Sequence, residues 1–220
     1  MSRSTVYGLP LVGVRRQPGG EDGDPLIFST VQGDIAGRYH PVSGGMAVRG
    51  VVWLPGTGNG IAGPAHGLYR TLAQECQAQG IESLRIDYRR VNRLEECVRD
   101  ALVATYWLTR ERGIERIALV GHAIGGSAAI IAGVAADEVR MVAALAAPAT
   151  AAQAVAALGK PLFLCHGADD EVVPATASLR LEQRAPGDVT CRIYPGALHD
   201  LDHCRDALSA DLIGWLDDHL

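Results

Sequence analysis

The sequence predicts an α/β protein in which a mostly parallel sheet carries helices on both faces. Two observations support this prediction: short apolar segments alternate with amphipathic ones from residue 49 onward, and glycine-rich turns separate them. Strands and helices that alternate in this way form right-handed βαβ units, whose parallel strands are buried on both sides. A chain of 220 residues has the usual size of one α/β domain, so we expect a single domain over residues 1–220.

The N-terminal part of the sequence follows a different pattern. Residues 1–25 contain a strand-like segment at 6–14 and a loop rich in glycine, proline and aspartate, which predicts an edge strand and its connection. The apolar segments 26–31 and 35–40 flank the Gln-Gly-Asp sequence at 32–34, which is typical of an antiparallel hairpin with a glycine turn. We therefore expect an eight-stranded sheet that is mostly parallel and begins with an antiparallel hairpin.

The rest of the chain alternates between predicted strands and predicted helices. The predicted strands span residues 49–54, 81–88, 117–120, 139–147, 162–165 and 189–194. The predicted helices span residues 67–79, 94–112, 127–135, 151–158, 175–184 and 205–220. Only one short helix fits between the strands at 139–147 and 162–165, so we expect no large lid over the site.

Charge and cysteine usage exclude several classes of protein. The formal net charge of −5 and the pI near 5.8 give no electrostatic reason to bind nucleic acid or an anionic membrane surface. The odd cysteine count and the absence of a C-x-x-C pair favour buried, reduced thiols over a disulfide framework. These cysteines are Cys76, Cys97, Cys165, Cys191 and Cys204. The first residues lack a signal-peptide pattern and no apolar run is long enough to cross a bilayer, so we expect a cytoplasmic location. The oligomeric state stays open.

The segment Gly121-His122-Ala123-Ile124-Gly125 lies between an apolar strand and a helix of small residues. Glycines at these places leave room for a sharp turn whose central residue has a strained backbone. The segment resembles the G-x-S-x-G sequence of the α/β-hydrolase superfamily, in which the central serine is the nucleophile. Ala123 stands at that position here, and alanine has no nucleophilic atom.

Three further segments resemble the same superfamily in the same order along the chain. The first, residues 53–58 (Trp-Leu-Pro-Gly-Thr-Gly), follows the first predicted parallel strand and resembles the loop that supplies an oxyanion-hole N–H group. The resemblance implies that the backbone N–H groups of Thr57 and Ile124 form that hole. The histidine usual in this loop is replaced by Pro55.

The other two segments supply an acid and a histidine. Residues 166–174 (His-Gly-Ala-Asp-Asp-Glu-Val-Val-Pro) resemble the acid loop, and the distance to the proline favours Asp170 over its neighbour Asp169. Acidic residues here are also suited to cap the helix predicted after them. Residues 194–200 (Tyr-Pro-Gly-Ala-Leu-His-Asp) resemble the histidine loop, which implies that His199 is the general base and later the general acid.

The resemblance covers nearly the whole chain from about residue 26 onward. It implies the α/β-hydrolase fold and a lidless serine esterase or acyl hydrolase, similar to dienelactone hydrolases or serine aminopeptidases. The expected substrate is a small molecule with an ester or related acyl group. The glycine-rich segment 56–63 lacks the features of a P-loop or a dinucleotide fingerprint, so no cofactor is expected.

Ala123 leaves three explanations open. In the first, the natural protein has serine at this position and the present chain carries a Ser→Ala change. In the second, the protein is naturally without a nucleophile and is a binding protein. In the third, His199 acts as a general base on water or a carbon acid without covalent catalysis.

We expect the other residues with reactive side chains to have no catalytic or metal-binding role. The run from His199 to Cys204 contains two histidines four residues apart, but it enters a helix from a loop, and we expect no metal site there. Cys165 lies late in a buried strand and is not aimed at the oxyanion hole. His122 needs no special role. The arginines after the strand at 81–88 are interpreted as a solvated loop: Arg89, Arg90 and Arg93.

Overall fold

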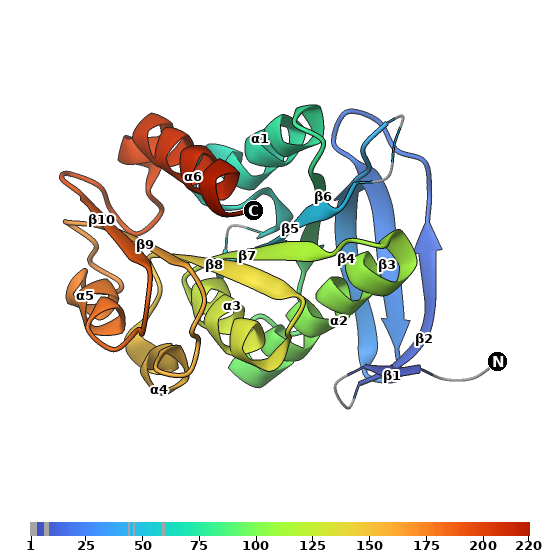
Figure 1. Ribbon diagram of the computed structural model, residues 1–220, viewed down its shortest axis with the longest axis horizontal. Helices are drawn as coiled ribbons and strands as arrows, with labels where there is room; N and C mark the ends of the chain where they lie inside the picture. Colours follow the sequence, from blue (N-terminus) through green and yellow to red (C-terminus); the bar gives the residue numbers. More distant parts are fainter. Residues whose placement is uncertain (1–3, 7–8, 44, 46, 59) are drawn as a thin grey trace.

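One ten-stranded sheet runs through the whole computed structural model, which describes residues 4–6, 9–43, 45, 47–58 and 60–220 (Figure 1). The order of the strands is β1-β2-β3-β4-β6-β5-β7-β8-β9-β10. The strands are β1 (Ser4–Val6), β2 (Leu9–Arg16), β3 (Asp24–Thr30), β4 (Gly33–His40), β5 (Arg49–Leu54), β6 (Glu82–Asp87), β7 (Arg116–His122), β8 (Val139–Leu145), β9 (Leu162–Gly167) and β10 (Val189–Tyr194). Strands β5 to β10 are parallel, whereas β1 to β4 are antiparallel and β4 pairs antiparallel with β6.

The predicted fold class is therefore confirmed, while the expected number of eight strands is wrong. The N-terminal segment supplies two strands, because β1 folds back and pairs with β2, and the hairpin adds two more to the six parallel strands. The hairpin turn also differs from the prediction. Thr30 pairs with Gly33, so the turn is Val31-Gln32 and Gly33 already belongs to β4. Gly33 has φ 120°, and glycine is the residue that adopts such a value without strain.

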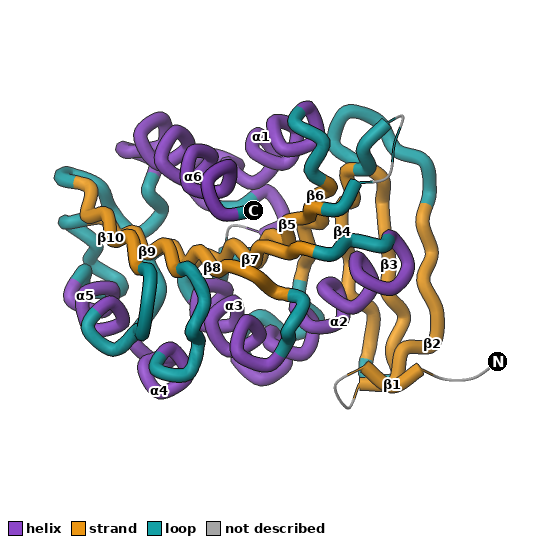
Figure 2. Tube along the Cα trace, viewed as in Figure 1, coloured by secondary structure: helices purple, strands orange, loops and turns teal. Residues whose placement is uncertain are grey.

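Helices cover both faces of the sheet, as the alternating pattern predicts (Figure 2). The helices are α1 (Pro64–Ala78), α2 (Leu94–Arg112), α3 (Ile124–Ala135), α4 (Ala152–Val155), α5 (Thr176–Glu182) and α6 (Arg205–His219), with 3-10 turns η1 (Gly60–Ala62), η2 (Ala149–Ala151) and η3 (Asp202–Cys204). One face carries α1 and α6, whose apolar sides form one core cluster with the sheet. The other face carries α2 to α5, and the larger core cluster lies beneath α2 and α3.

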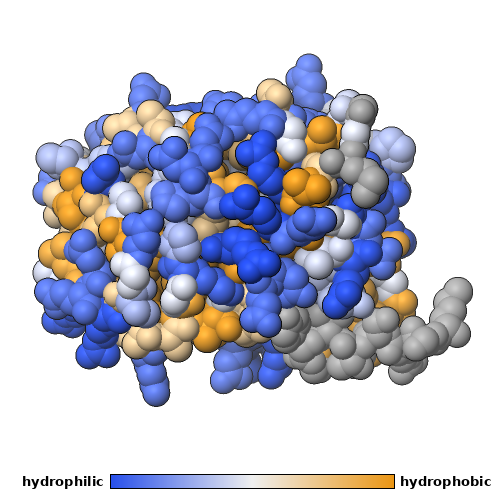
Figure 3. All heavy atoms as spheres, in the orientation of Figure 1, coloured by the Kyte–Doolittle hydropathy of each residue, from blue (hydrophilic) through white to orange (hydrophobic). Residues whose placement is uncertain are grey.

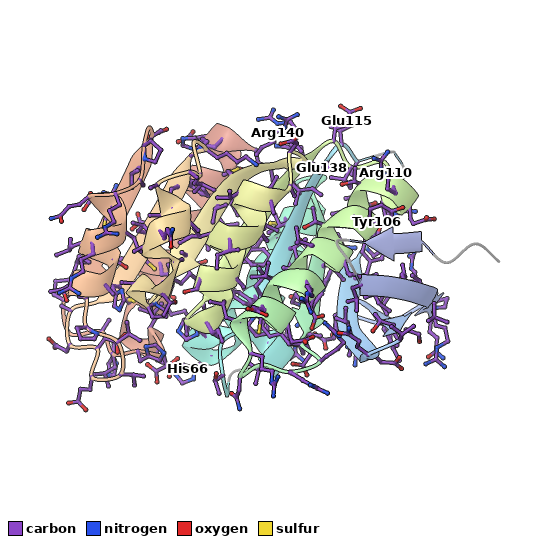
Figure 4. The ribbon with its side chains drawn as sticks, turned by 90° about the horizontal axis from the view of Figure 1, so that it is seen from below. His66, Tyr106, Arg110, Glu115, Glu138 and Arg140 are labelled. Carbon is purple, nitrogen blue, oxygen red and sulfur yellow. The ribbon has the colours of Figure 1, made fainter. Side chains whose placement is uncertain are left out.

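The parallel strands bring all four predicted site segments to one edge of the sheet. The loops that follow β5, β7, β9 and β10 start at the carboxyl ends of these strands, which share an edge in a parallel sheet. Figure 4 shows His66, just after the β5 loop, at this edge, while Glu115, Glu138 and Arg140 lie at the opposite edge. The fold thus brings together segments that lie as far apart in the sequence as residues 53–58 and 194–200.

Arg89 corrects one interpretation from the sequence. Its side chain is only 3% exposed and forms ion pairs with Asp100 (2.6 Å) and Glu96 (2.7 Å) of α2. Asp100 is fully buried, and a buried carboxylate requires a paired cation. The interpretation of the whole 89–93 segment as a solvated loop is therefore wrong for Arg89, which fixes the end of β6 to α2.

The connection between β8 and β9, which the structure describes throughout, contains only η2 and α4, so no large lid is inserted there. Hydrophilic side chains cover much of the face seen in Figure 3, with apolar residues in small groups between them. Within the described part of the chain, no helix is both long enough and apolar enough to span a membrane.

The close packing between β5 and α3 predicts the effect of a single methyl group. A Cβ on Gly125 would overlap the backbone carbonyl oxygens of Leu54 and Pro55, and neither strand nor helix end can move aside. We expect Gly125→Ala to lower the free energy of unfolding by about 3 kcal/mol or more. Urea unfolding at pH 7 measures this change.

Gly214→Ala is the matched control, because a Cβ on this exposed residue of α6 meets nothing within 4 Å. Alanine is the better helix former, so this variant should gain about 0.5–1 kcal/mol. Equal stability of the two variants would contradict the close approach of β5 and α3.

Candidate active site

Ala123 lies in a strained turn between β7 and α3. Its φ of 50° and ψ of −119° are rare for a residue with a side chain, and such backbone costs on the order of 1–3 kcal/mol. The turn persists because its surroundings determine it: the N–H of Ala123 donates to the carbonyl oxygen of Leu145 at 2.8 Å. A Cβ on Gly121 would overlap Gly125, so both predicted glycines are required.

The loop after β5 lies directly against this turn. A Cβ on Gly56 would lie 3.2 Å from the Cβ of Ala123 and 2.5 Å from Nδ1 of His122. Thr57 follows Gly56 and is exposed. Ile124 is the first residue of α3, and N–H groups in the first turn of a helix have no carbonyl partner within the helix. Ile124 therefore follows Ala123 directly, and Thr57 follows the glycine that packs against Ala123.

Asp170 and His199 form a hydrogen-bonded pair. Nδ1 of His199 lies 2.8 Å from Oδ2 of Asp170 and donates to it, because an ionised carboxylate only accepts. Oδ1 accepts the N–H groups of Val172 and Val173, both at 2.8 Å. Burial raises the pKa of Asp170, but the hydrogen bonds from Val173 and His199 outweigh it and hold the pKa below its ordinary value. Asp170 is therefore an anion that holds His199 in one orientation.

The structure distinguishes Asp170 from Asp169. The side chain of Asp169 is exposed, and its backbone N–H donates to the carbonyl oxygen of Ala197 at 3.0 Å. That backbone bond joins the acid loop to the histidine loop. Asp170 accepts the N–H groups of Val172 and Val173 ahead of α5, but no side chain caps α5 itself, so the capping interpretation is wrong.

His122, for which no special role was expected, connects the strained turn to the histidine loop. Its Nε2 lies 2.9 Å from the carbonyl oxygen of His199, and the two rings have centroids 5.0 Å apart. Burial lowers the pKa of His122 to about 4, so the ring is neutral at pH 7. Because a carbonyl oxygen only accepts, Nε2 carries the proton. This bond holds the backbone of His199 next to His122, the residue before Ala123.

A second contact holds the histidine loop from the side of α1. The N–H of Ala65 donates to the carbonyl oxygen of Asp200 at 2.8 Å, and Nε2 of His66 lies 3.3 Å from Oδ2 of Asp202. Ala65 and His66 both have positive φ, at 50° and 53°. The structure starts α1 at Pro64 rather than at the predicted residue 67, and the backbone is not regular helix until after Gly67, whose φ is 85°.

A shallow depression of about 250 Å³ lies beside His199. Its lining consists of Glu171, Val172, Leu198, His199 and Asp200. Val172 and Leu198 remain 70% and 39% exposed, which places apolar surface on the acid loop and on the histidine loop next to the imidazole. The depression is open to solvent, in agreement with the absence of a large lid.

The contacts of His166 and Ser178 were missed from the sequence. His166 is fully buried at the end of β9, and its Nε2 lies 3.2 Å from Oδ2 of Asp170. Its Nδ1 lies 2.7 Å from Oγ of Ser178 in α5. A polar residue at the end of an otherwise apolar strand was a usable signal, since a buried histidine requires hydrogen-bond partners.

The other residues considered for catalysis or metal binding, Cys165 and the run from His199 to Cys204, lie in surroundings that do not favour such a role. Burial raises the pKa of Cys165 well above its ordinary value, so this fully buried thiol stays protonated. Within the described residues, no group of three or more His, Cys, Asp and Glu side chains is arranged to hold a metal ion. His199, the first histidine of the run considered for a metal, is paired with Asp170.

Comparison with solved structures identifies the fold. A dienelactone hydrolase from Anabaena variabilis superposes with a TM-score of 0.78 and 18% identity, covering 94% of this chain and 99% of that chain. Est1E from Butyrivibrio proteoclasticus gives 0.76 and 15%, covering 88% and 98%. A putative α/β hydrolase from Agrobacterium tumefaciens, of unknown function, gives 0.76 and 20%, covering 88% and 94%. The protein therefore has the α/β-hydrolase fold.

A family model described as serine aminopeptidase, S33, matches residues 141–203. The match includes Asp170 and His199 but begins after Ala123. It agrees with the superfamily resemblance of the acid and histidine loops.

The buried, neutral histidines predict how stability depends on pH. Burial lowers the pKa of His122 and of His40 to about 4, whereas an unfolded histidine titrates near about 6.5. Between these values the unfolded state binds protons that the folded state does not, so the free energy of unfolding falls as the pH falls. We expect each residue to contribute about 1–3 kcal/mol to this loss between pH 7 and pH 4.

Urea unfolding of the parent and of His122→Asn at pH 7 and pH 4.5 tests the assignment. The difference in stability between the two pH values should shrink in His122→Asn and stay as in the parent in His203→Asn, which alters an exposed residue. An equal pH dependence in all three proteins would show that His122 is not buried as a neutral ring.

Proposed function

We propose that this protein is an α/β-hydrolase that acts on carboxylic esters or related acyl compounds and that the present chain lacks the nucleophile. One observation carries the proposal: the Asp170–His199 pair, joined at 2.8 Å, is connected through His122 to a strained turn with Ala123 at its centre. The α/β-hydrolase fold and its esterase and dienelactone hydrolase neighbours support the same class of reaction. The substrate is a small acyl compound, and the cytoplasmic location stays a prediction from sequence.

With serine at position 123, the site would perform acyl transfer. The hydroxyl would attack the carbonyl carbon while His199 takes its proton, and Asp170 would stabilise the imidazolium that forms. The N–H groups of Thr57 and Ile124 would donate to the oxyanion of the tetrahedral intermediate. His199 would then give its proton to the leaving group. Water would attack the acyl carbonyl while His199 takes its proton, and His199 would return that proton to the serine oxygen as the acid leaves.

With Ala123, the covalent route is absent, although the other groups remain. Removal of a triad nucleophile costs on the order of 10⁶-fold in turnover, because only binding and oxyanion stabilisation are left. The open depression beside His199 and its apolar edge still offer a surface for an ester. The chain as it stands is therefore a binder of substrates that it hydrolyses very slowly.

A natural binding protein of this fold is the second candidate, and Ala123 itself is the observation that favours it. Water activation by His199 without a nucleophile is the third explanation. Under both, serine at position 123 would bring no large gain in hydrolysis, because the pocket would hold its ligand in a different geometry.

Ala123→Ser tests the proposal on short-chain aryl esters. We expect turnover to rise by roughly 10⁴-fold or more over the parent, because the missing atom is supplied to an otherwise complete site. Initial rates by release of the phenol measure the change. His199→Gln and Asp170→Asn in the serine background should each remove most of the gain.

A folded Ala123→Ser protein with no gain on any ester would contradict the proposal and leave the binding protein as the better explanation. Residual hydrolysis by the parent that disappears in His199→Gln would instead favour direct activation of water.

A further inference from the structure

Two histidine rings contact the same carboxylate oxygen of Asp170. Nδ1 of His199 lies 2.8 Å from Oδ2, and Nε2 of His166 lies 3.2 Å from it. The other oxygen, Oδ1, accepts the backbone N–H groups of Val172 and Val173. The carboxylate thus has donors on both oxygens, and the mechanism described above uses only the one from His199.

The surroundings of His166 fix which of its nitrogens carries the proton. Nε2 lies 2.9 Å from the carbonyl oxygen of Val173, which only accepts, so Nε2 is protonated. Nδ1 lies 2.7 Å from Oγ of Ser178, whose hydroxyl can donate to it. The ring is fully buried, and burial lowers its pKa, which keeps His166 neutral at pH 7. The Nε2–H tautomer is therefore the one that fits all of these contacts.

We propose that His166 is a positioning residue for Asp170: its Nε2–H, held in place by Ser178, is shared between Val173 and Oδ2 and limits the negative charge that this oxygen presents to His199. The proposal deepens the proposed function because it concerns the same pair of residues. It does not require that the pair be catalytically active in the present chain.

The direction of the effect follows from electrostatics. A donor on Oδ2 stabilises the carboxylate, so less of its charge is available to stabilise the imidazolium form of His199. The positive end of the N–H dipole also lies near that imidazolium. Loss of the His166 donor should therefore make His199 more basic, whereas a merely structural role would loosen the pair and make His199 less basic.

Other ionisable groups lie around His199 and have to stay constant during the test. They are His122 from β7, Asp169 and Glu171 from the acid loop, and Asp200 from the histidine loop. His122 remains neutral above about pH 4, so it does not titrate in the range where the change in His199 is expected.

The experiment is an NMR titration of the histidine rings in the present chain, with His199 assigned by His199→Gln. We expect His166→Leu to raise the pKa of His199 by about half a unit or more, the size of effect that one hydrogen bond to a charged group produces. His166→Gln keeps an amide donor near the same place and should return most of the shift. Ser178→Ala, which removes only the contact to Nδ1, should give a smaller rise of the same sign.

His40→Leu is the matched control, because His40 is also a buried histidine with a lowered pKa but is bonded to Arg85 on the neighbouring strand β6. It should lower stability and leave the pKa of His199 unchanged. If His166→Leu does not fold, Ser178→Ala decides the question. An unchanged or lowered pKa of His199 in folded His166→Leu, or in Ser178→Ala where His166→Leu does not fold, would overturn the proposal.

The titration separates this inference from the proposed function, since it needs no turnover. If Ala123→Ser restores hydrolysis, the acidic limb of its pH–rate profile should move to higher pH in the His166→Leu background by the same amount as the titration. If Ala123→Ser is inactive, a raised pKa of His199 still supports the role of His166, and only the proposed function fails.

Discussion

The hydrogen bond between Asp170 and His199 is the interaction on which the arrangement of the site depends. It joins the loop after β9 to the loop after β10, next to the backbone hydrogen bond from Asp169 to Ala197. The bond is itself held at both ends. Backbone N–H groups fix Oδ1 of Asp170, and His122 fixes the backbone of His199. A parallel sheet makes this possible, because the carboxyl ends of its strands share one edge.

Ala123 occupies a backbone position whose strain has no structural benefit of its own. The conformation is imposed by the bond to Leu145 and by the close approach of Gly121, Gly125 and the β5 loop. Such strain is usually maintained where a side chain has to be presented to a substrate. The strained turn and the contact between Asp170 and His199 are therefore the observations that support the proposed nucleophile position at Ala123.

Much of this arrangement was predictable from the sequence, because it depends on local patterns. The 3.6-residue period and the terminal Gly113 gave α2 its bounds, and the spacing to Pro174 selected Asp170. The tertiary contacts were not predictable in this way. The burial of Arg89 depends on Asp100, which is buried only after α2 packs. The contact of His166 with Asp170 depends on how the acid loop folds back over the end of β9.

The most direct test of the account is covalent labelling at position 123. A reactive aryl phosphonate should form one adduct per chain on Ala123→Ser, located at residue 123 by peptide mass spectrometry, and none on the parent. This result would show that the turn, the histidine and the oxyanion donors are arranged for nucleophilic attack. A folded Ala123→Ser protein that takes up no label, or takes it up elsewhere, would contradict the claim that Ala123 stands at the nucleophile position.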